Sequence, residues 1–395
     1  MNSAYGLYIH VPFCRHKCIY CDFYSTTHLA DIPRYLNAVM QEWESFCLNP
    51  PSGGFAISSL YWGGGTPSLL TPRQVQRVLD RIHQHGTVPA DAEITLEANP
   101  GALDDAHLAA YRRAGINRLS LGVQSFIDHE LEFLTRIHNT ADVRRSFSAA
   151  RRAGFDNISL DLIFALPRQT VAEWKHSLLQ AIDLAPEHIS MYGLTIEKGT
   201  PLHDGLTRGA RVSCDEEVQR EMYLLGKEML EAAGYTQYEI SNFARPGREA
   251  RHNQHYWAGG PYLGLGPAAH SFAEGRRWWN VRDVQTYCRA LENGEKAAGG
   301  EEILSRDQLR AEAILLGLRR RRGIDLAAWE RTFAETPRAL FSAALESLGG
   351  CEQQAPPFQD APSGRLLTCA AGHLALTAHG ILLYDYVCRK LYECL

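Results

Sequence analysis

Three cysteines near the start of the chain have the spacing of ligands to one inorganic centre. Cys14, Cys18 and Cys21 form a C-x3-C-x2-C run directly after the apolar stretch Tyr5–Phe13. A structural zinc site requires four ligands, usually in two separated pairs, whereas the remaining cysteines are scattered singly. Three thiolates instead suit a [4Fe–4S] cluster whose fourth iron is open to a substrate or cofactor. Three unrelated thiols or a zinc loop are the alternatives.

Other residues that could do chemistry lie where strand-like runs end. Three glycines and Thr66 follow the second run, where the backbone can approach a ligand and expose its N–H and C=O groups. Glu97, Gln124 and Asp161 belong to three later runs and would face one cavity; ordinary polar residues on a rim are the alternative. Arg136 carries a guanidinium suited to a bidentate grip on a carboxylate.

The elements that must position these residues alternate between strand and helix. Runs rich in β-branched and aromatic residues predict six strands, and capping-box patterns at Thr71 and Thr170 begin two of the helices between them. A further helix is expected at Asp215–Ala233. This alternation predicts an α/β fold with a parallel sheet and the chemistry at the C-terminal strand ends. The predicted strands are Tyr5–Val11, Ser58–Trp62, Glu93–Glu97, Arg118–Val123, Asn157–Phe164 and His188–Ile196.

The cysteine run and the stretches GGGTPS, GVQSF and DLIFALP together resemble the radical S-adenosylmethionine (SAM) superfamily, and within it the HemN-like proteins. The resemblance implies a partial (β/α)6 TIM-type barrel in which Cys14, Cys18 and Cys21 hold a [4Fe–4S] cluster whose open iron chelates SAM. The family usually has Leu-Gly-Arg where this chain has Leu134-Thr135-Arg136. For the two tyrosines among the implied SAM-binding residues, core packing is the alternative. The residues implied to bind SAM are Tyr8, Tyr20, Gly63, Gly64, Gly65, Thr66, Glu97, Gln124, Arg136, Asp161 and Ile163.

Further details separate branches of this family. The coproporphyrinogen III dehydrogenase carries a fourth cysteine two residues after the third, and an extension ahead of the cluster, whereas here Cys21 is followed by Asp22 and Phe23 and Cys14 lies near the first residue. His252-Asn253-Gln254-His255-Tyr256-Trp257 resembles the HNxxYW motif of the HemW haem-chaperone branch. That resemblance implies that His252, Tyr256 and Trp257 bind haem, with His252 as the iron ligand. A buried His/Trp turn joining barrel and tail is the alternative.

The C-terminal part differs in pattern from the rest. From about Glu301 helical runs dominate, followed by a loop or wing at Gly349–Gly364, a short strand at Leu374–Thr377 and a final helix to Leu395. This order resembles the winged-helix-like tail of HemN-like proteins. We therefore expect a barrel with the cluster and SAM site at 1–240, a connecting segment with the HNxxYW motif at 241–300, and a mainly helical domain at 301–395. Arg319–Arg322 is interpreted as a solvated helix end, with docking to an acidic partner protein or to an anionic membrane surface as the alternatives.

Composition narrows the class of protein. Hydrophobic residues make up 45% of the 395, and the formal net charge of −5 argues against nucleic-acid binding. No secretory signal or transmembrane stretch is visible, so we expect a cytoplasmic protein. The resemblance implies haem as ligand and haem-accepting proteins such as respiratory enzymes as partners. It leaves open a homodimer and an electron donor such as flavodoxin or an NAD(P)H system.

Whether the chain is an enzyme also stays open at this point. A haem chaperone is the leading interpretation. Oxidative decarboxylation of coproporphyrinogen III, radical modification or degradation of haem, and a winged-helix regulator that senses haem or redox state are the alternatives.

Overall fold

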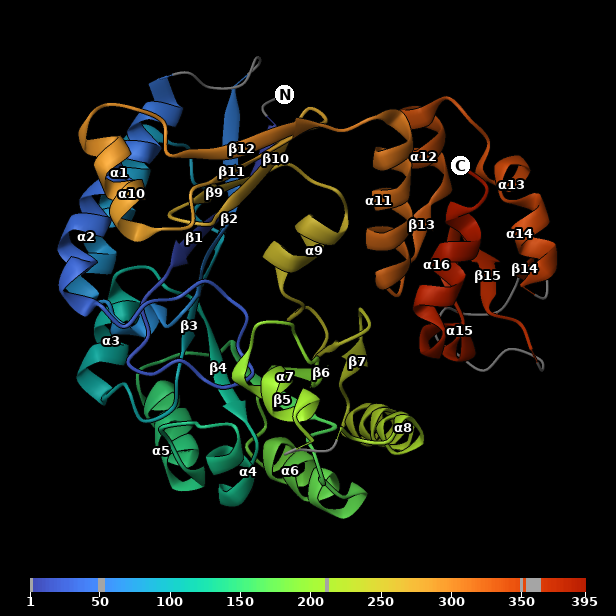
Figure 1. Cartoon of the computed structure of the whole chain (residues 1–395), viewed down its shortest axis with the longest axis horizontal. Helices are drawn as coiled ribbons and strands as arrows, with labels where there is room; N and C mark the ends of the chain where they lie inside the picture. The colour runs from blue at the N-terminus through green and yellow to red at the C-terminus, as the bar shows by residue number, and fades with distance from the viewer. Residues whose placement is uncertain (1–2, 49–53, 210–212, 349–350, 353–363) are drawn as a thin grey trace.

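The computed structural model describes residues 3–48, 54–209, 213–348, 351–352 and 364–395, which form a larger and a smaller part (Figure 1). The larger part is built on one 12-stranded sheet, with most of its helices on one side. The smaller part contains the C-terminal residues and has its own sheet of four strands. The two parts meet beside helix α11 (Arg306–Arg319).

The centre of the large sheet consists of the six strands expected from the sequence. They pair in parallel and neighbour one another in chain order, as successive right-handed βαβ crossovers require. The α/β partial-barrel fold is therefore confirmed, although the sixth strand ends at Gly193 instead of Ile196. The six strands are β1 (Ser3–Val11), β2 (Phe55–Gly64), β3 (Glu93–Ala98), β4 (Arg118–Gln124), β5 (Ile158–Phe164) and β6 (His188–Gly193).

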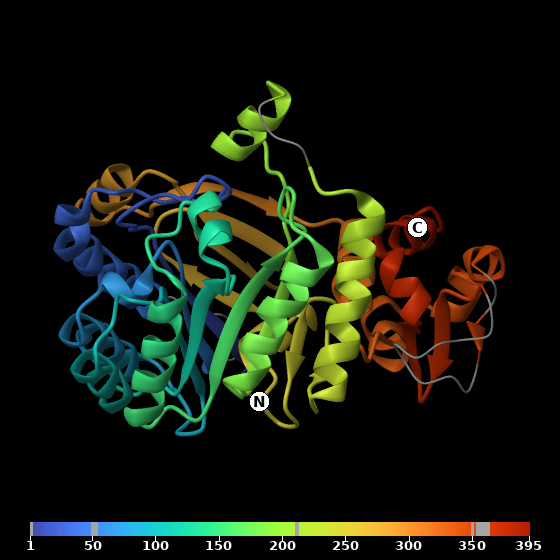
Figure 2. The ribbon, with the colours of Figure 1, turned by 90° about the horizontal axis from the view of Figure 1, so that it is seen from below.

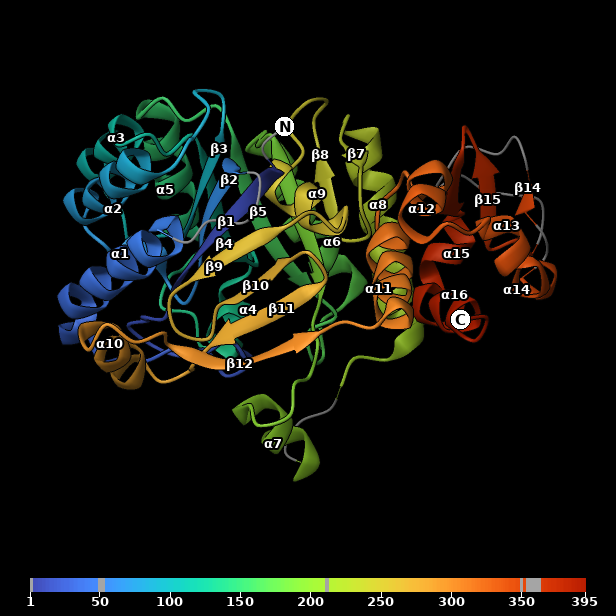
Figure 3. The ribbon, with the colours of Figure 1, turned by 90° about the horizontal axis from the view of Figure 1, so that it is seen from above.

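Helices follow the strands and cover the outer face of the sheet. The capping boxes at Thr71 and Thr170 are present, because each threonine side chain accepts a hydrogen bond from the backbone N–H three residues later. A short helix, α7, stands away from the body in Figures 2 and 3. The helical segments of this part are η1 (Leu29–Asp31), α1 (Ile32–Leu48), η2 (Pro67–Leu69), α2 (Pro72–His85), α3 (Asp105–Arg113), α4 (Asp128–Phe133), α5 (Thr140–Arg152), α6 (Val171–Asp183), α7 (Pro201–Thr207) and α8 (Glu216–Ala232).

The sequence did not predict that the sheet continues beyond these six strands. The segment expected to be a connection, 241–300, contains α9 (Arg251–Trp257), α10 (Val284–Glu292) and several short strands. One of them, β9, pairs in parallel with β1, and three antiparallel strands extend that edge. The division at 240 and 300 stays a prediction. The added strands are β7 (Thr236–Gln237), β8 (Asn242–Ala244), β9 (Tyr262–Leu265), β10 (His270–Ala273), β11 (Arg276–Asn280) and β12 (Ala298–Ile303).

The two faces of the sheet differ in chemistry. In β4, Leu119 and Leu121 are buried in the main hydrophobic core. The alternate residues are polar: the Ser120 hydroxyl donates to Asp161, and the Gly122 carbonyl accepts from Arg136. Because successive strand residues point to opposite faces, this alternation puts polar groups on the concave inner face. The candidate residues of the site lie on that face.

The C-terminal part folds around its own apolar cluster, which includes Ile314, Trp329, Phe341 and Leu376. The short strand expected at Leu374–Thr377 is present as β16, but the expected final helix is broken at Leu383, which has φ −116° and ψ 28°. Most of the expected wing, 349–364, lies outside the described residues. Besides α11 the elements are β13 (Ile324–Asp325), α12 (Leu326–Phe333), α13 (Pro337–Leu340), α14 (Ser342–Ser347), β14 (Cys351–Glu352), β15 (Leu367–Ala370), β16 (His373–Leu376), α15 (Ala378–Leu382) and α16 (Tyr384–Tyr392).

Within the described ranges, none of the helices combines the length and the apolar composition that are needed to cross a lipid bilayer.

Candidate functional site

The three cysteines lie in the loop that follows β1. The loop is fixed at its start, because the Cys14 N–H donates to the Thr26 carbonyl at 2.9 Å. Two side chains from other segments reach its sulfurs: the Thr66 hydroxyl, after β2, donates to Cys14 Sγ at 3.5 Å, and Arg136 Nη1, from the loop after α4, donates to Cys18 Sγ at 3.7 Å. Burial is the main cause that raises the pKa of Cys21, and the other two thiols raise it further. The three sulfurs therefore belong to one polar site.

The donor set fits a cluster better than a single metal ion. Among the described residues, the one group of three candidate ligands that lies close enough to share an ion is His129, Glu130 and Glu173, which contains no cysteine. The three sulfurs are thus spread more widely than ligands of one ion. Thiolates around a polynuclear iron–sulfur cluster are expected to be spread in this way, and hydrogen bonds to their sulfurs tune its potential.

A chain of hydrogen bonds connects Arg136 to the cysteine loop. Arg136 Nη2 donates to Asn99 Oδ1 at 2.6 Å and to the Gly122 carbonyl at 2.8 Å, while Asn99 Nδ2 donates to Thr66 Oγ1 at 3.3 Å. Arg136 Nε is buried and has no partner in the described part of the chain, while the side chain lines a small pocket together with Cys18 and Thr66. The sequence interpretation did not include Asn99 in the site, although the Asn-Pro pair at a strand end was visible.

Thr135, where the family usually has glycine, makes a contact that a glycine could not make. Its φ is +55°, a left-handed conformation that glycine adopts freely and that is strained for a β-branched residue. The Thr135 hydroxyl accepts a hydrogen bond from the Ile19 N–H at 3.2 Å, inside the cysteine loop. The threonine thus ties the loop to the segment that carries Arg136, a contact that glycine could not make.

The three glycines after β2 are required by close packing around the same loop. A Cβ on Gly63 would lie 2.9 Å from the Tyr8 ring, and one on Gly65 would lie 2.7 Å from the Phe13 carbonyl oxygen. Gly64 has φ +107° and lies against His10. These positions let the end of β2 touch the backbone just before Cys14. Their predicted contact with SAM remains a prediction.

Two acidic side chains occupy the inner face, Glu97 on β3 and Asp161 on β5, with β4 between them. Tyr61 donates to Glu97 Oε1 at 2.7 Å, and Tyr61 also stacks on Tyr8 with ring centroids 6.3 Å apart. Burial raises the pKa of Glu97 to about 7, and the nearby Asp161 carboxylate adds to this shift. Burial also raises the pKa of Asp161, although hydrogen bonds from the hydroxyls of Ser190, Ser120 and Ser159 lower it in part. Glu97 can therefore gain or lose a proton near neutral pH.

The remaining predicted SAM residues surround the same region. Tyr20 packs on a small apolar cluster that contains Leu134 and Ile163. Gln124, the last residue of β4, has φ +68°. Its side chain and that of Arg136 both lie against Gly122: a Cβ at Gly122 would be 3.1 Å from Gln124 Nε2 and 3.3 Å from Arg136 Nη2. The fold thus brings residues from β1 to β5 together around the cysteine loop.

The HNQHYW stretch forms α9, which crosses the inner face of the sheet. His252 lies over β1 and β2: its Nδ1 shares a 3.0 Å hydrogen bond with the Ser59 hydroxyl, and its ring lies 5.2 Å from that of Tyr61. Its side chain is buried, and this burial lowers the pKa of His252 to about 3. One turn later, the Tyr256 ring lies 5.0 Å from that of Tyr262 on β9. The motif therefore reaches two different environments.

A cavity of about 1070 Å³ lies between α9, strands β9 to β11 and the C-terminal helices α11 and α12. Its walls include Tyr256 and Trp257 of the motif, whereas His252 is absent from the described residues that line it. Seven aromatic residues among those described contribute to the lining beside aliphatic and charged ones, and aromatic side chains are common in sites that hold large apolar ligands. The other aromatic residues of the lining are Tyr262, Phe272, Trp279, Trp329 and Phe333.

The arginine run is a structural joint between the two parts of the molecule. Arg319 forms an ion pair with Glu239, whose side chain is fully buried, at 2.7 Å, and it lies over the Trp257 ring at 4.5 Å. Arg320 lines the cavity, and Arg321 donates to the Gln237 carbonyl at 3.5 Å. At least three of the four arginines therefore contact the protein itself.

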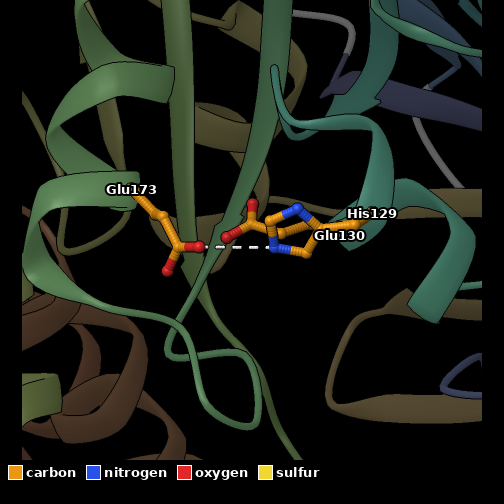
Figure 4. A group of neighbouring side chains, drawn as sticks. All are labelled: His129, Glu130 and Glu173. Carbon is orange, nitrogen blue, oxygen red and sulfur yellow. Dashed lines mark ion pairs between the residues drawn. The ribbon is translucent and has the colours of Figure 1, made fainter.

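The group of His129, Glu130 and Glu173 is shown in Figure 4. His129 Nε2 lies 3.3 Å from Glu173 Oε1. Glu130 is buried and accepts from Ser125 and Gln169, while Glu173 caps α6. Because each carboxylate already has protein partners, these residues have a structural explanation without a metal.

Two parts of the chain match known protein families. Residues 8–181 match the family model of the Radical SAM superfamily, and residues 304–383 match that of the HemN C-terminal domain. The chain is 35% identical to the "Heme chaperone HemW" of Mycobacterium tuberculosis over 99% of this chain and 95% of that protein. It is 37% identical to the protein of the same name from Bacillus subtilis, over 88% and 91%.

Among solved structures, coproporphyrinogen III oxidase (HemN) from Escherichia coli has a similar fold. The TM-score is 0.83 at 23% identity, and the match covers 100% of this chain and 91% of that one.

Proposed function

The chain belongs to the HemW family of radical SAM proteins, and on this basis we propose that it binds haem and delivers it to haem-dependent proteins such as respiratory enzymes. The observation that carries the proposal is the aromatic cavity of about 1070 Å³ at the end of the HNxxYW motif. Its size and lining suit a porphyrin, which is large, flat and mostly apolar. The two relatives named above are called haem chaperones.

Membership of the radical SAM superfamily implies a [4Fe–4S] cluster and SAM. We propose that Cys14, Cys18 and Cys21 hold the cluster, which when bound can supply one electron to SAM. The small pocket that Arg136 lines together with Cys18 and Thr66 supports a role for this guanidinium in holding the SAM carboxylate. Glu97, on the same inner face, would accept a hydrogen bond from the amino group of SAM. An electron donor such as flavodoxin or an NAD(P)H system would then be a partner.

The test is an anaerobic haem titration of the cluster-reconstituted protein with SAM and a reductant, followed by absorption spectroscopy. We expect saturable binding, a stable Soret band, and recovery of activity when the loaded protein is mixed with a haem-depleted respiratory enzyme. Absence of saturable binding would refute the proposal. A variant with all three cluster cysteines replaced by alanine should lose the iron and sulfide of the cluster, and a full cluster in that variant would refute the ligand set.

A haem-modifying enzyme is the second candidate, because the residues around the cysteine loop form an intact hydrogen-bonded network. The same titration separates the two functions. Loss of the Soret band together with release of 5'-deoxyadenosine would favour the enzyme, whereas a persistent band favours the chaperone.

A further inference from the structure

The cavity contains a histidine outside the HNxxYW motif. His270, on β10, is the one histidine among the described residues that line the cavity, and its side chain is exposed. Its ring stacks on Trp279 with centroids 5.6 Å apart and an angle of 25° between the planes. No hydrogen bond of either ring nitrogen to a described residue is present. The imidazole is thus oriented by an aromatic neighbour while its nitrogens remain open to a ligand.

The two histidines of the HNxxYW motif differ from His270, because they do not line the cavity and each has a ring nitrogen in a hydrogen bond. His252 is buried away from the cavity and uses Nδ1 for Ser59, and His255 shares a 2.8 Å hydrogen bond between Nε2 and the Pro261 carbonyl. Desolvation is the main cause that lowers the pKa of His270, and Arg277 lowers it further, so the ring is neutral at neutral pH. A neutral imidazole is the form that binds iron.

The charged residues among the described lining of the cavity are Arg277, Arg320, Glu302, Glu312 and Asp325. Arg277 is already neutralised, because it pairs with Glu302 at 3.1 Å and Glu312 at 2.6 Å. Arg320 is half-buried, and its Nε donates to the neutral amide oxygen of Gln254 at 3.2 Å. No ion pair of Arg320 is present among the described residues. The negative charge of Asp325 acts on Arg320 without forming an ion pair with it, so this partly desolvated guanidinium can still donate to a carboxylate beside it.

From this arrangement we infer that haem occupies the cavity with the His270 imidazole as an axial ligand of the iron and Arg320 on a propionate. The inference rests on the proposed function and names the contacts by which it would operate. Haem would then touch both parts of the molecule, because Trp279 belongs to the sheet and Trp329 to the C-terminal domain. The prediction that His252 is the ligand is tested in the same experiments.

The first experiment compares haem titrations of the wild-type holoprotein, H270A and H252A. We expect H270A to lose the histidine-ligated spectrum and to bind haem about tenfold more weakly or worse, which corresponds to one coordinate or charge-assisted contact. Added imidazole should restore the spectrum in H270A, because truncation leaves room for it, and H252A should keep the wild-type spectrum. Wild-type behaviour of H270A, or loss of the spectrum in H252A alone, would overturn the ligand assignment and leave haem binding itself intact.

The second experiment compares haem with its dimethyl ester, which lacks the propionate charges. Wild-type protein should prefer haem by about tenfold, R320Q should bind both equally, and R321Q serves as the matched control because Arg321 does not line the cavity. An undiminished preference in R320Q would overturn the role of Arg320. If the wild-type protein bound neither compound, the proposed function would fail, an outcome distinct from failure of these two contacts.

Discussion

Replacing Thr135 separates the strain of the backbone from the hydrogen bond that holds the cysteine loop. Thr135 adopts φ +55° and accepts the Ile19 N–H at 3.2 Å. Thr135→Gly removes both the strain and the acceptor. Thr135→Val keeps the shape and the strain but removes the acceptor, so the two variants differ in which effect they isolate.

The expected magnitudes follow from these two terms. A left-handed conformation costs a residue with a Cβ about 1–2 kcal/mol, whereas glycine adds about 0.5–1 kcal/mol of chain entropy on folding. The lost hydrogen bond costs about 1 kcal/mol. In Thr135→Gly these effects nearly cancel, so its free energy of unfolding should lie within about 1 kcal/mol of the wild type. Thr135→Val should lose about 1–2 kcal/mol, because the half-buried Ile19 N–H also loses its acceptor.

The assay is urea unfolding of the cluster-free protein, together with the rate at which a chelator removes iron from the reconstituted protein. We expect Thr135→Val to unfold at lower urea and to lose iron faster than the wild type. Thr135→Ser, which keeps the hydroxyl without β-branching, is the matched control and should retain iron as the wild type does. Equal stability of the valine and glycine variants, or iron loss from the valine variant as slow as from the wild type, would refute the reasoning.

Three further predictions concern other parts of the structure. Arg319→Met should destabilise the protein by about 3–5 kcal/mol, because it leaves the fully buried Glu239 carboxylate without its cation, and adding Glu239→Gln should recover part of the loss in thermal unfolding. Burial holds the pKa of His188 well below its usual value, so below about pH 6.5 the unfolded chain binds a proton that the folded chain does not bind. The free energy of unfolding should therefore fall by up to about 1.4 kcal/mol per pH unit as the pH decreases. Urea titration at several pH values should show a shallower slope for H188Q. Gly65→Ala should destabilise the cysteine loop by about 1–3 kcal/mol, because its Cβ would lie 2.7 Å from a backbone oxygen, whereas Gly154→Ala should cost about 1 kcal/mol, since no atom lies within 4 Å of its Cβ; equal losses by differential scanning calorimetry would exclude the steric argument.

Much of the fold was predictable because it depends on local patterns. The six central strands are runs rich in β-branched and aromatic residues, and helices such as α2 and α6 begin at the capping boxes of Thr71 and Thr170. Both are short-range signals. The strands β9 to β12 were missed because they have only four to six residues each, and they become strands by pairing with β1 and with one another.

The site divides in the same way. The spacing of Cys14, Cys18 and Cys21 and the run of glycines after β2 are visible in the sequence, because one loop and one strand end contain them. The hydrogen bonds from Arg136 through Asn99 to Thr66 join the loop after α4 to the ends of β3 and β2, and no spacing in the sequence indicates them. Which of these segments lie side by side depends on the tertiary structure of the sheet.

The HNxxYW motif shows most clearly what the sequence alone cannot predict. The sequence by itself identified the motif and the superfamily, since both are contiguous patterns of residue types. Only the tertiary structure placed His252 against Ser59 and Tyr61, and Trp257 in a cavity that His270 and Arg320 also line. These residues are far apart in the chain and belong to different elements, so their proximity depends on how α9 crosses the sheet and how the C-terminal helices pack beside it. Such long-range packing is set by shape and burial over the whole molecule, which local sequence patterns do not encode.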